Sequence, residues 1–114
     1  MTVRDLVEKL NLTVQTTGTN LDTRVTGGYA GDLLSDVMAN SKSGNVWVTM
    51  QVHVNIVAVA VLKEHAAIIL VNHRTPAEDT LRRANEEHIT VLTSGKPAFE
   101  TIGALVKLGL SGIP

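Results

Sequence analysis

Short apolar runs alternate with helical patterns in the second half of this 114-residue chain, and this alternation most limits the folds open to it. Residues 66–71 are apolar throughout, which is typical of a strand buried on both faces. Residues 89–92, Ile-Thr-Val-Leu, are a second predicted buried strand, and helical patterns lie before, between and after the two strands. Strands that alternate with helices form parallel sheets through right-handed crossovers. The sequence therefore predicts an α/β fold with a mostly parallel sheet.

Three helix starts can be located from capping patterns. Thr2 and Asp5 have the spacing of a capping box, and the first helix has one apolar face. Thr75 as N-cap, with Pro76 at the first helical position, starts another helix. Pro97 opens the last helix. The core face of that last helix is predicted to comprise Phe99, Ile102, Leu105, Val106 and Leu110.

Two segments fit more than one element. Residues 23–34 hold three glycines within five residues. This segment fits two short strands interrupted at the glycines, or a strand, a glycine turn and a helix that begins near residue 31. Residues 52–63 are rich in β-branched side chains but long for a strand, and they present a helical face, so we favour a helix. Residues 12–15 and 46–49 are predicted strands.

Composition excludes several classes of function. The chain has no cysteine, which rules out disulfides, thiol catalysis and cysteine-ligated zinc. The formal net charge is -1, and Lys and Arg are scattered along the sequence, so we expect no nucleic-acid partner. The longest apolar run, residues 56–62, is too short to span a membrane. We expect a cytoplasmic protein with no membrane partner, folded as a single domain over residues 1–114.

A series of segments, in order along the chain, resembles the DRTGG domain. The name-giving motif is matched by Thr26-Gly27-Gly28, with Arg24 and Val25 in the places of its Asp and Arg. The likeness continues through residues 32–38, 45–49, 55–60 and 66–70, then Pro76 and residues 89–92. It covers the chain from about residue 21 to residue 110.

This resemblance implies a three-layer sandwich similar to the N-terminal domain of HPr kinase and, more remotely, of Mur ligases. It also implies a non-catalytic role, because such domains are accessory modules beside CBS domains in regulated pyrophosphatases and in long phosphate acetyltransferases. Free-standing versions occur as well. Relatives tend to form dimers, so a homodimer is expected here.

The glycine-rich segment is the first candidate site. Backbone N–H groups at a glycine turn can hold a phosphate. However, the pattern is neither GxGxxG nor a P-loop, and Asp32 and Asp36 would repel an anion. We favour a structural role for this motif, and we keep its residues as candidates for the border of a ligand pocket: Thr26, Gly27 and Gly28.

Polar residues that follow the predicted strands are the second candidate site. His73 and Arg74 come directly after a buried strand, and open α/β sheets bind ligands at the carboxyl ends of their strands. Ser94 lies in a Thr-Ser-Gly-Lys connection between a strand and a helix, which can hold an anion, although we favour an ordinary strand-to-helix connection. Gln51 and His53 precede or open the predicted 52–63 helix, and they either face a cleft or a second subunit or belong to an ordinary solvated helix start.

No catalytic or metal-binding set can be named from the sequence. The four histidines form no HxH or HExxH pattern, and no particular histidine pairs with Ser94. No cofactor is assigned. The function predicted is a regulatory or ligand-sensing module that is dimeric, acts on a partner metabolic enzyme, and binds a nucleotide-like, phosphate-bearing small molecule. The alternative is a structural interaction module without a ligand.

Overall fold

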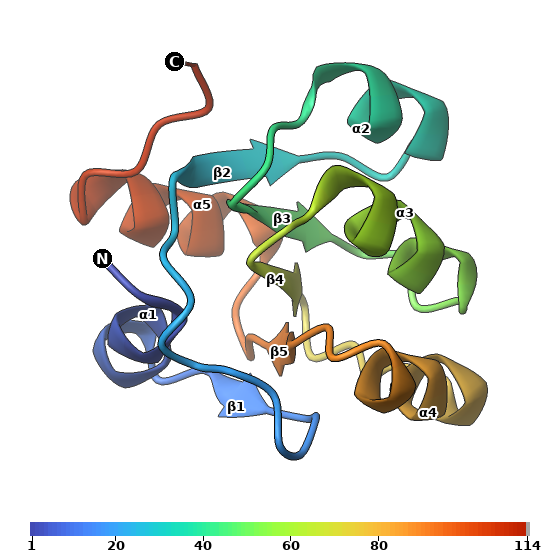
Figure 1. The fold of residues 1–114 in the computed structure, drawn as a ribbon. Coiled ribbons are helices and arrows are strands. Elements are labelled where there is room, and N and C mark those ends of the chain that lie inside the picture. Colours follow the sequence, from blue (N-terminus) through green and yellow to red (C-terminus); the bar gives the residue numbers. More distant parts are fainter. Residues whose placement is uncertain (114) are drawn as a thin grey trace.

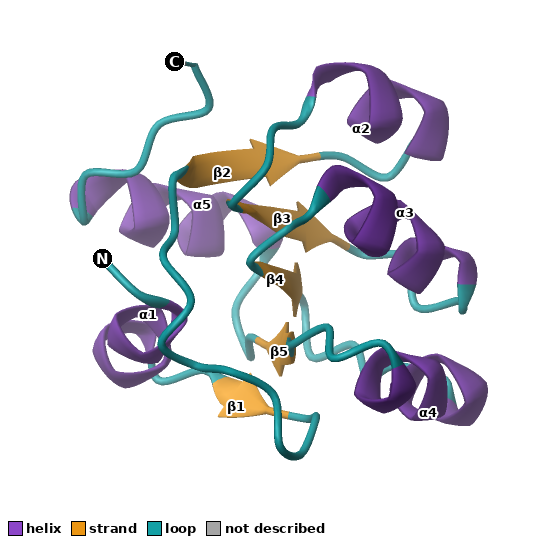
Figure 2. Ribbon diagram, in the orientation of Figure 1, coloured by secondary structure: helices purple, strands orange, loops and turns teal. Residues whose placement is uncertain are grey.

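A computed structural model describes residues 1–113 and contains five helices and five strands within that range (Figures 1 and 2). In chain order the elements are α1 (Val3–Leu10), β1 (Thr13–Val14), β2 (Gly27–Ala30), α2 (Leu34–Asn40), β3 (Asn45–Thr49), α3 (Asn55–Lys63), β4 (Ala67–Leu70), α4 (Glu78–Glu86), β5 (Val91–Thr93) and α5 (Ala98–Lys107).

The strands form one sheet in the order β1-β5-β4-β3-β2. Strands β2 to β5 are parallel to one another, and β1 joins β5 in the antiparallel sense. Helices α2, α3 and α4 cover one face of the sheet, whereas α1 and α5 cover the other (Figure 1). This confirms the predicted three-layer α/β sandwich with a mostly parallel sheet.

Each face of the sheet has its own apolar core. Neighbouring residues of a strand point to opposite faces, so Val46 and Val48 pack beneath α1 and α5, while Trp47 packs beneath α2 and α3. The two central strands, β3 and β4, are buried along their whole length. Burial on both faces explains why residues 66–71 are apolar throughout.

Two of the predicted helices are confirmed closely. The capping box of α1 is complete, because the Asp5 N–H donates to Thr2 Oγ1 (3.2 Å) and the Thr2 N–H donates to Asp5 Oδ2 (2.9 Å). These hydrogen bonds hold the pKa of the Asp5 carboxyl below its ordinary value. The β-branched segment 52–63 is helical as α3, which begins at Asn55.

Two helix details differ from prediction. Helix α4 begins at Glu78 with Ala77 as its N-cap, because the Ala77 N–H and the Thr80 hydroxyl both bond to Val52 O (3.2 and 2.7 Å) and tie the helix start to the loop before α3. In α5 the predicted core residues Phe99 and Val106 are 85% and 60% exposed.

The predicted glycine turn is absent from its expected place. Gly27 and Gly28 lie within strand β2 and have no positive φ, and the following helix, α2, begins only at Leu34. Neither of the two arrangements considered for residues 23–34 is therefore correct. A different requirement explains Gly27: a Cβ there would lie 2.6 Å from the backbone oxygen of Ser111. The glycine allows the C-terminal segment, residues 110–113, to approach the edge strand.

Candidate functional site

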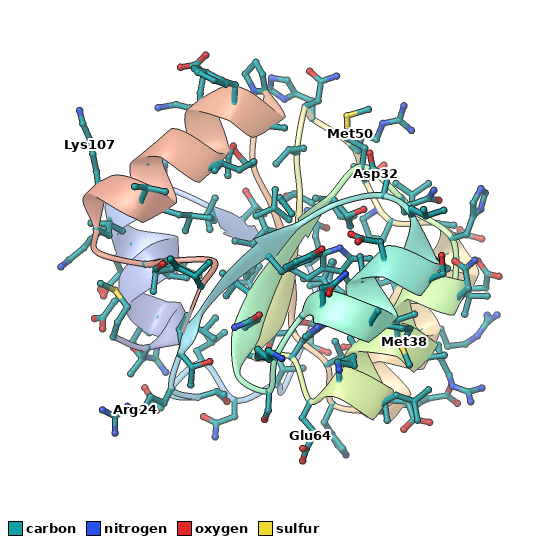
Figure 3. All side chains as sticks on the ribbon, turned by 90° about the horizontal axis from the view of Figure 1, so that it is seen from above. Arg24, Asp32, Met38, Met50, Glu64 and Lys107 are labelled. Carbon is teal, nitrogen blue, oxygen red and sulfur yellow. The ribbon has the colours of Figure 1, made fainter. Side chains whose placement is uncertain are left out.

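The sheet separates the predicted site residues into two groups at opposite ends. Gln51 and His53 follow β3, His73 and Arg74 follow β4, and Ser94 follows β5, so these five share the carboxyl edge. The Thr26-Gly27-Gly28 motif lies at the amino end of β2. Figure 3 shows the same two ends, with Asp32 and Met50 near one and Arg24 and Glu64 near the other. The motif and the carboxyl-edge residues therefore do not border one pocket.

At the amino end, the hydroxyl and the backbone N–H of Thr26 both donate hydrogen bonds within the fold. Its hydroxyl donates to Ser43 O (2.8 Å), and its N–H donates to Gly44 O (3.0 Å). The Gly28 N–H donates to Ser111 O (3.1 Å), which fastens the C-terminal segment to the edge strand. The motif thus closes the turn between α2 and β3 and positions the C-terminal segment.

Gln51 is also engaged within the fold. Its side-chain amide donates to Asp32 O (3.1 Å). The Asp32 carboxylate in turn accepts bonds from the Thr49 hydroxyl (2.7 Å) and the Met50 N–H (2.8 Å). These bonds join the ends of β2 and β3. His53 is exposed just before α3. We find neither Gln51 nor His53 in the cleft formed by the other three carboxyl-edge residues.

The loops after β4 and β5 are bonded to one another. The Asn72 N–H donates to Lys96 O (2.8 Å), and the His73 N–H donates to Ser94 O (3.1 Å). The His73 ring packs directly on Gly95, where a Cβ would lie 2.9 Å from Cε1. Asn72 and His73 both adopt positive φ (62° and 58°) to make this contact. The two loops therefore form one structural unit.

These loops line two adjoining hollows. The lysine hollow, about 560 Å³, lies between the end of α1, the loop after β5 and α5, and it includes Lys9, Lys96 and Lys107. The arginine hollow, about 330 Å³, includes His73 and Arg74. The two share three residues, namely Asn11, Ser94 and Gly95. We call the combined space the basic cleft.

Charge is unevenly distributed around the basic cleft. Four of the ten Lys and Arg residues of the chain line it, and none of the eleven Asp and Glu residues does. None of these four cations forms a salt bridge within residues 1–113. Unpaired cations in a concave surface focus a positive potential that attracts anions. The cleft is therefore suited to an anionic ligand, although the whole chain carries a formal net charge of -1.

The lining residues that sequence reasoning missed include Lys9, Asn11 and Lys107. Lys9 and Lys107 lie in the last turns of α1 and α5, where a basic residue is expected from the helix dipole alone. Asn11 is the left-handed C-cap of α1 (φ 53°), a position that favours asparagine for backbone reasons. No local pattern links these residues. Only the packing of α1 beside α5 brings them together.

The Ser94 side chain links two elements that line the cleft. It is 5% exposed, its hydroxyl lies 2.9 Å from Thr101 Oγ1, and it accepts the Lys96 N–H (3.2 Å). Its side chain therefore joins the loop after β5 to the first turns of α5. Its partners are a threonine hydroxyl and a backbone amide, which do not make a serine nucleophilic.

A buried Ser–His pair lies on the other face of the sheet. His65 Nε2 is 2.9 Å from Ser41 Oγ, and that hydroxyl donates to Val37 O (2.6 Å). Because the hydroxyl proton goes to Val37, Nε2 carries the proton of the ring and Nδ1 is a bare acceptor. Ser41 is fully buried and His65 is 6% exposed, so the pair is closed to substrates. Burial lowers the pKa of His65 to about 4.

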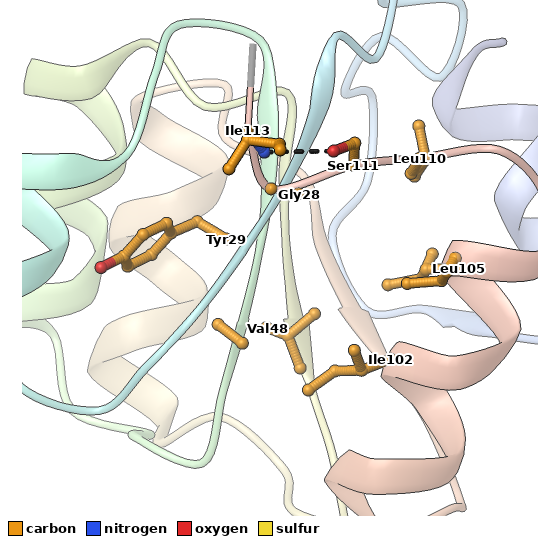
Figure 4. Close-up of a pocket in the computed structure, with 11 residues that line it drawn as sticks. Gly28, Tyr29, Val48, Ile102, Leu105, Leu110, Ser111 and Ile113 are labelled. Carbon is orange, nitrogen blue, oxygen red and sulfur yellow. Dashed lines mark hydrogen bonds between the residues drawn. The ribbon is translucent and has the colours of Figure 1, made fainter.

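An apolar groove of about 320 Å³ runs along the edge strand β2 (Figure 4). Its walls are β2, the Ile102, Leu105 and Val106 side of α5, and the C-terminal segment. Helix α5 thus borders the basic cleft through Thr101, Ala104 and Lys107 and borders the apolar groove through its opposite side. Among the described residues we find no cluster of metal-ligating side chains and no helix long and apolar enough to cross a membrane.

Comparison with known proteins agrees with this architecture. The regulatory region of Clostridium perfringens pyrophosphatase, comprising CBS and DRTGG domains and complexed with the activator diadenosine tetraphosphate, superposes with a TM-score of 0.67 at 13% identity. The match covers 98% of this chain and 47% of the pyrophosphatase chain. The fold is DRTGG-like. No family model matches the sequence. No curated protein matches it either.

The DRTGG-like fold agrees with the resemblance found in the sequence. Our chain spans about half the length of the solved pyrophosphatase region, which joins this kind of domain to CBS domains. At 13% identity the likeness concerns the fold. The chain is thus similar in fold to part of that regulatory region.

Proposed function

We propose that this DRTGG-like chain is a non-catalytic regulatory module that binds a phosphate-bearing metabolite, such as a nucleotide, in the basic cleft. In this proposal it works as a homodimer and acts on a partner metabolic enzyme. The observation that carries the proposal is the separation of charge: four unpaired cations and no carboxylate line the cleft. Its position at the carboxyl ends of β4 and β5 is where open α/β sheets bind ligands.

Two further features support a regulatory role. The pyrophosphatase region of the same fold is complexed with a nucleotide activator. In our chain, α5 separates the basic cleft from the apolar groove, so a ligand that shifts α5 changes both surfaces. An element that borders both a ligand site and a partner surface can couple the two sites.

Nucleotide binding tests the first part of the proposal. We expect ATP to raise the melting temperature, because a ligand of the native state stabilises it. Replacement Lys96→Gln removes a charged donor, so ATP affinity measured by calorimetry falls by about tenfold. The matched control Lys42→Gln removes an exposed lysine outside the cleft and leaves the affinity unchanged. No thermal shift with any nucleotide at millimolar concentration, or equal losses in both variants, would contradict the proposal.

Exposed apolar side chains support the alternative, a structural interaction module without a ligand. Phe99, Val106 and Ile113 are 85%, 60% and 79% exposed, and the last two line the apolar groove. Such side chains on one side of a molecule are typical of an interface. This alternative shares the dimer with the main proposal but requires no metabolite.

The oligomeric state tests this surface. We expect light scattering after gel filtration to give a dimer mass, and Val106→Glu to lower it towards the monomer, because a charge cannot be buried unpaired in an apolar interface. The control Leu62→Glu alters a side chain of α3 that is 70% exposed on the opposite face of the sheet, and it keeps the dimer. A monomer at every concentration would exclude homodimerisation. A dimer resistant to Val106→Glu would place its interface elsewhere.

A further inference from the structure

The basic cleft is elongated rather than round. Its lysine hollow follows α5 from the Ser94–Lys96 loop to Lys107 at the last helical turn. At about 1.5 Å of rise per residue, the stretch of α5 that lines the hollow, from Thr101 to Lys107, covers roughly 9 Å. The arginine hollow continues the cleft past Ser94 and Gly95 to His73 and Arg74.

The cations are distributed along this length instead of meeting at one point. Arg74 stands in the arginine hollow, Lys96 stands in the loop beside the shared residues, and Lys107 stands at the far end of the lysine hollow. An orthophosphate ion is only a few ångströms across. Arg74 and Lys107 line different hollows, so we expect one orthophosphate ion to occupy one hollow only.

The surface between the cations also suits a long ligand. Leu10, Ala104 and Leu108 give the lysine hollow an apolar wall. Asn11 lies where the two hollows meet, and its exposed side-chain amide forms no hydrogen bond within residues 1–113. It can donate to a group that passes from one hollow to the other.

We propose that the basic cleft binds an elongated polyanion, a ligand with phosphoryl groups at two or more points along its length that occupies both hollows at once. This inference rests on the proposed function and names its ligand class. The link between the loops after β4 and β5, through His73 and Gly95, keeps the two hollows in a fixed relation. A fixed spacing between the two loops that carry Arg74 and Lys96 favours a ligand whose charges match that spacing.

Calorimetry with orthophosphate, tripolyphosphate and ATP tests the inference on the full chain. We expect tripolyphosphate and ATP to bind at least roughly tenfold more tightly than orthophosphate. The variants Arg74→Gln and Lys107→Gln, at opposite ends, each weaken tripolyphosphate by roughly tenfold. Orthophosphate occupies one position, so at most one of the two replacements weakens its binding. Lys42→Gln again serves as the control, and circular dichroism checks that each variant is folded.

The outcomes separate this inference from the proposed function. Equal affinities for orthophosphate and tripolyphosphate, with weaker tripolyphosphate binding in only one of the two end variants, would contradict the elongated ligand. The proposed phosphate site would remain. If tripolyphosphate binds but ATP does not, the ligand is a polyphosphate without a nucleoside. If none of the three binds, the proposed function fails together with the inference.

Discussion

The fold is expected to lose about 3 kcal/mol of its free energy of unfolding when the pH falls from 7 to 4, through His65 alone. The pKa of this side chain is lowered from 6.5 to about 4, first by burial and second by the charge of Lys63. A difference of about 2.5 pKa units at about 1.36 kcal/mol per unit gives about 3.4 kcal/mol in all, of which about 3 kcal/mol is lost between pH 7 and pH 4.

The physical cause lies in how His65 is packed. Its ring centroid is 5.6 Å from that of Trp47, and its Nδ1 atom has no hydrogen-bond partner within residues 1–113. Protonation of Nδ1 would place a charge and an unpaired donor in an apolar core. Such a group is stable only when neutral.

The sign of the pH effect follows from the two pKa values. Below about pH 6.5 the unfolded chain binds a proton at His65, whereas the folded chain remains neutral down to about pH 4. The unfolded state therefore binds more protons in this window, and the free energy of unfolding falls with the pH. The stabilisation is complete above about pH 6.5 and is lost by about pH 4.

Urea denaturation at pH 7 and at pH 4 measures this loss. Other groups titrate over the same range, so the informative quantity is the difference between the wild type and a His65→Gln variant. The variant is less stable at pH 7 because it loses the packing of the ring. Between pH 7 and pH 4, however, its free energy of unfolding falls by about 3 kcal/mol less than that of the wild type. His88→Gln, at an exposed position, is the control and retains the wild-type dependence. Parallel pH curves for the wild type and His65→Gln would show that His65 is not responsible.

Sequence reasoning located the elements that depend on local chemistry. The capping box at Thr2 and Asp5 needs only neighbouring side chains, so α1 was predicted correctly. Burial on both faces makes β4 apolar in sequence, so the parallel sheet could be inferred as well. In residues 52–63 the β-branched side chains favour a strand, whereas the spacing of the apolar residues favours a helix. The helix was correct because Ile56, Val59 and Ala60 share the buried face.

Errors arose where a distant part of the chain decides the outcome. The start of α4 depends on bonds to Val52 O, which a reading of Thr75 and Pro76 does not reveal. Phe99 and Val106 fit a helical core face by spacing, yet α5 places them outside the core. Gly27 is needed because Ser111 approaches it, a contact between residues 84 positions apart (111 − 27).

The site shows the same division between local and distant effects. His73, Arg74 and Ser94 could be named because the carboxyl edge of a parallel sheet follows from strand order. Lys9 and Lys107 could not, because scattered lysines become a cleft only when α1 and α5 pack side by side (Figure 1). The overall charge of -1 conceals this local concentration.

The replacement Gly44→Ala is expected to destabilise the fold by about 2 to 5 kcal/mol, through two effects. Gly44 has a φ of 82°, in the left-handed region that L side chains disfavour. A Cβ there would also lie 2.6 Å from Cγ2 and 2.7 Å from Oγ1 of Thr26, which itself is fixed by the bond from its hydroxyl to Ser43 O. The backbone strain accounts for about 1 to 2 kcal/mol, and the overlap with Thr26 for the remainder.

A matched glycine separates the two effects. Gly18 has a φ of 69°, but a Cβ there would meet no atom within 4 Å, so Gly18→Ala measures backbone strain without overlap. We expect its cost to be about 1 to 2 kcal/mol. A double-mutant cycle adds a second measure, because in a Thr26→Ala background the nearest remaining atom, Cβ, is 3.2 Å away and the cost of Gly44→Ala falls towards that of Gly18→Ala.

Urea denaturation of the four chains in the cycle, and of Gly18→Ala, gives the free energies. If Gly44→Ala and Gly18→Ala cost the same, and Thr26→Ala gives no relief, Thr26 does not pack on Gly44 as the structure has it. The expected coupling assigns the threonine of the Thr26-Gly27-Gly28 motif to the turn between α2 and β3, while Gly27 admits Ser111. The motif then maintains the edge of the sheet, at the opposite end from the proposed anion site in the basic cleft.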